Sequence, residues 1–184
     1  MTKKTNSREV ILDAAEAVIL EMGAVHLSLD AVAQKAGVSK GGLLYNFPSK
    51  QALLKGMVTR LIDQYYADMK QEMAKFPVTA GQSLKASIAA GLGKNEHRKK
   101  IGRSMLAVLA HDKELLAPLR EAFDRQNEDI RKSGLPLARA EILSLATDGV
   151  MFRELLGVVT YSPAKRRTII GTMMQMIHEL EEKT

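Results

Sequence analysis

The sequence contains no cysteine, and this absence removes several kinds of site at once. Without a thiol there is no structural disulfide, no thiolate-bound zinc and no cysteine nucleophile. The sequence also lacks an uninterrupted apolar run of about 18 residues, the length that a membrane-spanning helix needs. Its basic amino-terminal segment runs into the charged residues Arg8 and Glu9, where a signal peptide would have an apolar core. We therefore expect a cytoplasmic chain with no membrane partner.

Motifs for metal binding and catalysis are lacking as well. The four histidines, His26, His97, His111 and His178, show no metal-ligand spacing with one another. No glycine-rich phosphate loop follows a strand pattern, and no nucleophile elbow is present. We therefore predict no metal, no cofactor and no catalytic residue, and we expect that the protein is not an enzyme.

The chain does have enough apolar surface for a core, together with a modest positive charge. A length of 184 residues and a hydrophobic content of 46% leave room for one or two domains. The net charge of +6 favours polyanionic partners. However, residues 1–50 hold six Lys and Arg against five acids, so this segment is nearly neutral. A nucleic-acid role must therefore be argued from the residue pattern and not from bulk charge.

Helical periodicity, interrupted by short Gly, Pro and Ser segments, runs through the whole chain. No convincing strand alternation extends beyond a few residues. The pattern predicts an all-α protein with about nine helices. We expect these helices at about residues 8–22, 29–36, 40–47, 50–76, 80–92, 97–111, 115–133, 138–158 and 163–181.

The most informative stretch runs from Ser28 to Lys50. Two short predicted helices meet there at a tight turn through Gly37, and Leu43 and Phe47 are expected in the core beneath them. This pattern is typical of a helix-turn-helix, whose second helix lies in the DNA major groove while the first crosses the backbone. The predicted DNA contacts are Ser28, Ser39, Lys40, Gly41, Gly42, Leu44, Tyr45, Asn46 and Lys50.

These contacts are expected to differ in kind. Ser28 and Ser39 cap the two helices where backbone amides would meet phosphate. Gly41 and Gly42 would let the backbone approach DNA, since glycine has no side chain. Each glycine costs a helix about 1 kcal/mol relative to alanine, and this cost suggests that the two glycines serve such a purpose. The alternatives remain that the glycines merely form a flexible loop and that Tyr45 is a half-buried packing residue. Among the other contacts, Lys40 and Lys50 offer cations, Tyr45 and Asn46 offer hydrogen bonds, and Leu44 offers packing or a thymine-methyl contact.

Residues 8–57 resemble the DNA-binding domain of the TetR (tetracycline-repressor-like) family of bacterial transcriptional regulators. The resemblance rests on the segment Ala-Gly-Val-Ser, a short reading helix ending in Phe47, and the following Pro-Ser-Lys with its leucine-bearing helix. The chain departs from the family at three positions. Thr or Ser is common where Gly42 stands, an aromatic where Leu44 stands, and His where Asn46 stands.

The resemblance implies two domains and a mechanism. A DNA-binding domain would occupy residues 1–48, and an effector-binding and dimerisation domain would occupy residues 49–184. The homodimer, most often a repressor, would bind a palindromic double-stranded DNA operator and be released by a small effector, apolar or amphipathic in character. The effector would tilt the helix that follows Ser49, changing the separation of the two reading helices from the ~34 Å of one DNA turn.

The second domain supplies two further sets of candidates. The expected effector contacts lie on the middle helices, which enclose the pocket in this family: Met105, Leu109, Phe123, Met151 and Phe152. The expected dimer contacts have three- and four-residue spacing on the last two helices: Ile142, Leu145, Gly149, Leu156, Ile169, Met173, Met176, Ile177 and Leu180. For both sets, ordinary core packing within one chain is the alternative.

Two other classes of protein remain open at this stage. An effector-independent architectural DNA-binding protein would show weak sequence preference and have no ligand cavity. A helical enzyme or binding protein would use the first helices only as scaffold, and it would show no salt-dependent affinity for duplex DNA.

Overall fold

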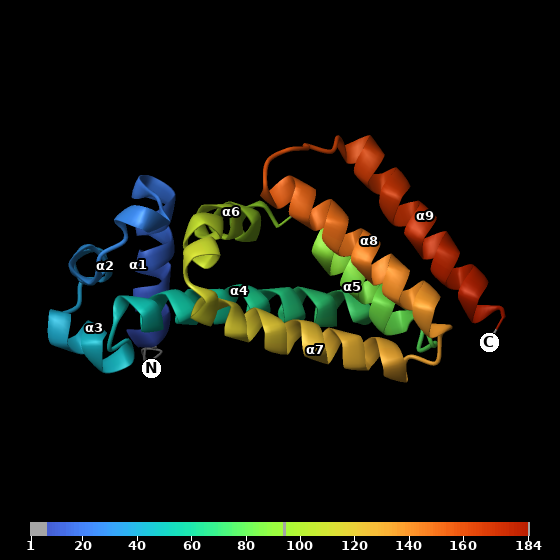
Figure 1. Ribbon diagram of the computed structural model, residues 1–184, viewed down its shortest axis with the longest axis horizontal. Coiled ribbons are helices and arrows are strands. Elements are labelled where there is room, and N and C mark those ends of the chain that lie inside the picture. Colours follow the sequence, from blue (N-terminus) through green and yellow to red (C-terminus); the bar gives the residue numbers. More distant parts are fainter. Residues whose placement is uncertain (1–6, 94, 184) are drawn as a thin grey trace, which may run out of the picture. The chain divides into compact units, whose positions relative to one another are not determined.

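The computed structural model describes residues 7–93 and 95–183 (Figure 1). The predicted domains begin at residue 1 and end at residue 184, and both positions lie outside the described residues. All regular structure in the described ranges is helical, which confirms the all-α prediction. The nine α-helices described are α1 (Ser7–Met22), α2 (Leu29–Ala36), α3 (Lys40–Asn46), α4 (Lys50–Met73), α5 (Gln82–Leu92), α6 (Glu96–His111), α7 (Ala117–Lys132), α8 (Leu137–Leu155) and α9 (Pro163–Glu181), with 3-10 turns η1 (Ala24–His26) and η2 (Lys113–Leu116).

The helices form two compact units. The amino-terminal unit comprises Met1–Ile62 and Glu96–Arg120, and the carboxy-terminal unit comprises Asp63–Asn95 and Glu121–Thr184. Helix α4 contributes residues to both units. A functional boundary at residue 48 stays a prediction.

In the amino-terminal unit, α1 packs against α2, α3 and the start of α6. Its core includes Leu12, Leu43 and Leu53, all fully buried. Gly56 of α4 lies directly against the ring of Phe47, because a Cβ at this glycine would stand 2.6 Å from the ring atom Cε1. This close approach fixes α4 against the end of α3.

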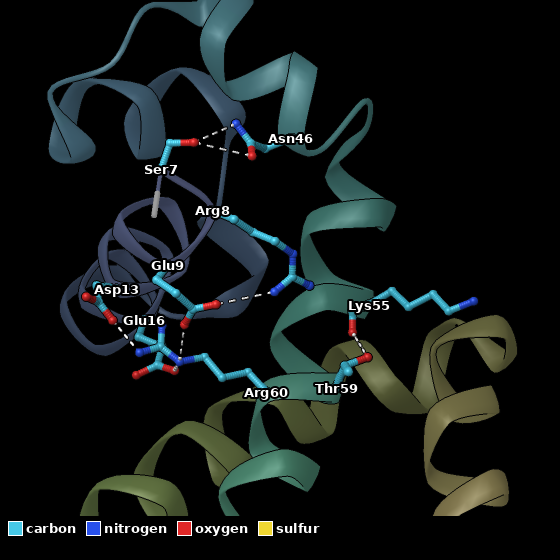
Figure 2. Close-up of polar contacts among 9 residues, drawn as sticks. All are labelled: Ser7, Arg8, Glu9, Asp13, Glu16, Asn46, Lys55, Thr59 and Arg60. Atoms are coloured by element: carbon cyan, nitrogen blue, oxygen red, sulfur yellow. Dashed lines mark hydrogen bonds and ion pairs between the residues drawn. The ribbon is translucent and has the colours of Figure 1, made fainter. Parts of the chain in front are cut away.

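A cluster of charged residues also ties α1 to α4 (Figure 2) and, through His97, to α6. Arg60 of α4 forms ion pairs with Glu9, Asp13 and Glu16 of α1. Glu16, which is buried, accepts a second contact from His97 of α6, whose Nε2 lies 2.6 Å from its Oε2. Burial lowers the pKa of Arg60, but the hydrogen bond to Asp13 and the nearby carboxylates outweigh it, so the pKa lies above its ordinary value.

In the carboxy-terminal unit, α5 packs against both α8 and α9 around a single apolar cluster. A nearly buried ion pair joins Glu154 at the end of α8 to Arg166 near the start of α9. Arg166 also donates from Nη1 to the backbone carbonyl of Leu92, at 3.0 Å. Arg166 therefore fastens the ends of three helices together.

A second polar clamp lies at the other end of α9. Lys85 of α5 donates to Glu181, with Nζ 2.7 Å from Oε2, and both side chains are largely buried. Burial of Glu181 opposes ionisation, but hydrogen bonds from Lys85, Thr79 and the Gly81 N–H outweigh it. The pKa of Glu181 is therefore lower than that of an ordinary glutamate.

The structure differs from the predicted helices mainly at two ends. Helix α4 stops at Met73, not at Phe76, and α8 stops at Leu155, not at residue 158. The second difference has a local cause, because Gly157 has a φ of 72°, in the left-handed region that ends helices. No helix in the described ranges is long and apolar enough to span a membrane.

Candidate DNA-binding site and effector cavity

The turn between α2 and α3 is built by capping residues on each side. Ser28 accepts a hydrogen bond from the Ala31 N–H at 3.2 Å, and Ser39 accepts one from the Gly42 N–H at 3.1 Å. Between the helices, Gly37 has a φ of 66°, a left-handed conformation that glycine adopts without strain. The predicted caps and the tight turn are therefore confirmed.

Helix α3 has one buried and one exposed side. Leu43 is fully buried and Phe47 is 3% exposed, as predicted. Tyr45 is 90% exposed and Leu44 is partly exposed, so both project from the other side. An aromatic residue so fully exposed makes little packing contact in the free protein, which excludes the half-buried alternative for Tyr45. This side of α3 is the candidate reading surface.

The cations near this surface already have partners within the chain. The Nζ of Lys40, at the start of α3, lies 2.9 Å from Oδ1 of Asp30 in the first turn of α2. At the start of α4, Lys50 donates to the Val25 carbonyl at 3.5 Å. Spacing in the sequence gave no signal for the pairing of Lys40 with Asp30, because it depends on how the two helices meet.

Asn46 makes its contacts inside the unit (Figure 2). Its amide nitrogen donates to the Gly42 carbonyl at 2.9 Å and lies 3.4 Å from the hydroxyl of Ser7. Asn46 therefore joins the end of α3 to the start of α1. A DNA contact by Asn46 stays a prediction, and it would require the amide to change partners.

The carboxy-terminal unit contains a small cavity among α4, α5 and α7, with a volume of about 10 Å³. Tyr65 and Tyr66 lie on its α4 side, and the hydroxyl oxygens of Tyr65 and Ser87 lie 2.7 Å apart. Tyr66 donates to the Ala122 carbonyl, and Arg125 stacks over its ring at 4.9 Å from the centroid. Burial raises the pKa of Tyr66, against the opposing effect of Arg125.

None of the residues predicted to contact an effector lines this cavity. Met105 is fully buried in the amino-terminal unit, and Met151 packs against Gly91 in the carboxy-terminal unit. Phe123 and Phe152 are about half exposed. Met69 of α4, one of several methionines that the sequence offers as adaptable ligand lining, does line the cavity. The other lining residues were missed, although the adjacent pair of tyrosines in α4 was an available signal. Leu109, the remaining candidate, is partly buried in α6.

The residues predicted for the dimer interface divide into two groups. Met173, Ile177 and Leu180 are buried in the core of the single chain. The others leave an apolar face on α8 and α9, with a groove of about 240 Å³ beside Ile142 and Met176. Its exposed members are Ile142, Leu145, Gly149, Leu156 and Met176, while Ile169 is partly buried.

These features define a helix-turn-helix DNA-binding protein: two short capped helices, a left-handed glycine between them, and an exposed side on the second helix. The comparisons with known proteins agree with this class. Residues 11–57 match the family model "Bacterial regulatory proteins, tetR family". Residues 81–178, more than half of the chain, match the model "Tetracyclin repressor-like, C-terminal domain". The chain belongs to the TetR family of transcriptional regulators.

One curated relative is similar over about a third of this chain, and solved structures share the fold over nearly all of it. The transcriptional regulator RutR of Escherichia coli K12 is 38% identical over 63 residues, which are 34% of this chain and 30% of that protein. A transcriptional regulator from Rhodococcus sp. Rha1 has a similar fold, with a TM-score of 0.73, 22% identity and coverage of 95% of this chain and 97% of the other. A putative TetR-family regulator from Rhodococcus sp. gives a TM-score of 0.70 at 18% identity, covering 95% and 98% of the two chains.

Proposed function

We propose that this protein is a homodimeric, ligand-responsive repressor that binds a palindromic operator and is released by a small-molecule effector. The observation that carries the proposal is the exposed side of α3, where Tyr45 stands clear of the core on a helix whose other side is buried. In a helix-turn-helix the second helix meets base edges in the major groove. The proposed contacts are those expected from the sequence, from Ser28 to Lys50.

The exposed apolar face on α8 and α9 supports a homodimer. Ile142, Leu145 and Leu156 are each more than half exposed on this face. Contiguous apolar surface of this kind is costly in water and marks interaction sites. A two-fold dimer would present two copies of α3 to half-sites about 34 Å apart along DNA.

The cavity beside Tyr65 and Tyr66 is the proposed effector site in place of the residues first expected. Its lining combines aromatic and apolar surface with hydroxyl, amide and carboxylate groups, which suits an amphipathic ligand. A volume of about 10 Å³ admits only a water-sized group, so an effector would have to bind a more open minor state. Selection of that state would shift α4 and the spacing of the reading helices. The regulator would act in the cytoplasm, where bacterial DNA is found.

The narrow cavity also favours a second candidate, an effector-independent architectural DNA-binding protein. Such a protein would need no ligand cavity, and its DNA affinity would vary little with sequence. The two candidates make opposite predictions for sequence selection.

The test is retention of genomic fragments by the protein at about physiological salt, followed by sequencing of the retained DNA. A sequence-specific regulator enriches a small set of fragments, whereas an architectural protein retains fragments without preference. Tyr45→Ala should abolish the enrichment, while the matched variant Tyr161→Ala, in the segment between α8 and α9, should preserve it. Equal enrichment by wild type and Tyr45→Ala would contradict the proposed reading surface.

A further inference from the structure

Helix α3 carries a single charged residue, and that residue is already paired. Lys40 is the only Lys, Arg, Asp or Glu in the segment Lys40–Asn46. Its ammonium nitrogen lies 2.9 Å from the Asp30 carboxylate, and the two side chains remain 62% and 73% exposed. Both groups are therefore open to solvent and within reach of a ligand at this surface.

Other cations of the amino-terminal unit are held in the same way. Lys35 of α2 lies 2.6 Å from Glu21 of α1, and Arg8 lies 3.4 Å from Glu9. Among the described residues up to position 50, Arg8, Lys35 and Lys40 therefore each form a local ion pair on the folded surface. Of these pairs, only Lys40 with Asp30 joins the two helices of the helix-turn-helix.

The position of Asp30 gives its pair a consequence for DNA binding. Asp30 stands in the first turn of α2, two residues after the cap Ser28, where the first helix of such a motif crosses the DNA backbone. A carboxylate at this place is repelled by phosphate and competes with phosphate for the Lys40 ammonium. Affinity for DNA of arbitrary sequence comes almost entirely from cations that release counterions from phosphates.

We propose that Asp30 is a positioning residue, which keeps Lys40 from binding phosphate on random DNA and yields it only to a stronger acceptor that the operator offers. The proposal rests on the proposed function, because it requires α3 to read DNA. On random duplex Lys40 stays with Asp30, so the reading helix adds no phosphate contact. On the operator Lys40 leaves Asp30 for a base edge, such as the paired acceptors of guanine in the major groove.

Removing the charge of Asp30 should therefore change the two kinds of binding differently. With Asp30→Asn, Lys40 is free to contact phosphate on random duplex. One added contact steepens the dependence of log K on log salt by about 0.9, while affinity rises at most about fivefold, because the exposed ion pair that is lost is worth no more than that. On the operator Lys40 is already engaged, so affinity rises by at most the same fivefold but the slope stays near the wild-type value, and the salt slope is the quantity that separates the two kinds of binding.

The experiment measures fluorescence anisotropy of two duplexes of equal length across a salt series. One duplex is a fragment enriched by the wild-type protein, and the other has the same composition in scrambled order. The control is Glu21→Gln, which frees Lys35 from a somewhat less exposed pair that joins α2 to α1 and not to α3. Asp30→Asn in a Lys40→Ala background separates release of Lys40 from the plain loss of a negative charge. Thermal unfolding of each variant verifies the fold.

The proposal expects a steeper salt slope on scrambled duplex for Asp30→Asn, little change for Glu21→Gln, and no steepening when Lys40 is absent. It would be overturned by equal slopes for wild type and Asp30→Asn on scrambled duplex, or by the same steepening in the Lys40→Ala background. If the wild type binds both duplexes normally, these results count against the role of Asp30 alone. If the wild type binds neither duplex at any salt, the proposed function itself fails.

Discussion

Replacement of Gly41 by alanine separates the effect of this residue on the stability of α3 from its effect on DNA binding. Gly41 has ordinary negative φ, and a Cβ built at this position meets nothing within 4 Å. Alanine is therefore accommodated without strain, and it restricts the unfolded chain more than glycine does. The expected gain in the free energy of unfolding is about 0.5–1 kcal/mol, which raises Tm by about 1–4 °C in a chain of this size.

The same methyl group should weaken operator binding. If the glycine is present so that the backbone can approach DNA, a side chain there keeps the two surfaces apart, and a tenfold loss of affinity corresponds to about 1.4 kcal/mol. Gly41→Ala should therefore be more stable than the wild type and bind the operator at least tenfold more weakly. The measurements are thermal unfolding without DNA and anisotropy with an enriched fragment.

Gly42→Ala is the matched control, because its Cβ would lie 3.3 Å from the capping hydroxyl of Ser39. The cap must shift, and a disturbed N-cap costs about 0.5–2 kcal/mol, so this variant should gain no stability. If Gly41→Ala stabilises the protein yet binds the operator like the wild type, the glycine is not required for DNA approach. A loss of stability in Gly41→Ala would contradict the open space around this position.

Three further predictions concern packing and charge. Arg166→Met should destabilise the protein by about 3–5 kcal/mol in urea unfolding, because it takes the guanidinium away from the buried carboxylate of Glu154, and adding Glu154→Leu should recover most of the loss. The pKa of Glu181 is lowered in the folded protein, so the ionised carboxylate should stabilise the fold fully above the unfolded pKa of about 4.3 and lose this effect as pH falls through the folded pKa. Lys85→Met should weaken this dependence of Tm on pH. An unchanged profile of Tm against pH would refute the stabilising contact between Lys85 and Glu181. Gly56→Ala should lower Tm despite alanine's higher helix propensity, because the new Cβ would lie 2.6 Å from a buried aromatic ring, and a raised Tm would show that the ring can move.

The sequence predicted the helix-turn-helix well because its signals are local. A capping serine, a glycine that permits positive φ and the apolar positions around Leu43 all act within a few residues of one another. Such features can be read without knowledge of the rest of the chain. The end of α8 at Leu155 was missed for a local reason also, since the role of Gly157 was not recognised.

The remaining features depend on which surfaces meet in three dimensions. Periodicity places Ile142 and Ile177 on equally apolar stripes, yet Ile142 is 61% exposed and Ile177 is fully buried. The spacing of apolar residues in one helix does not predict which other helix, if any, packs over that apolar stripe. The same limit hid the contact of Asn46 with Ser7, 39 residues away, and the pairing of Asp30 with Lys40.

Footprinting of an enriched fragment tests whether α3 reads DNA in a symmetric pair. We predict one protected site with two-fold symmetry, whose half-sites are centred about 34 Å apart on one side of the duplex. Protection should weaken steeply as salt rises. Protection spread evenly along the fragment, or a single unpaired half-site bound by a monomer, would contradict this prediction.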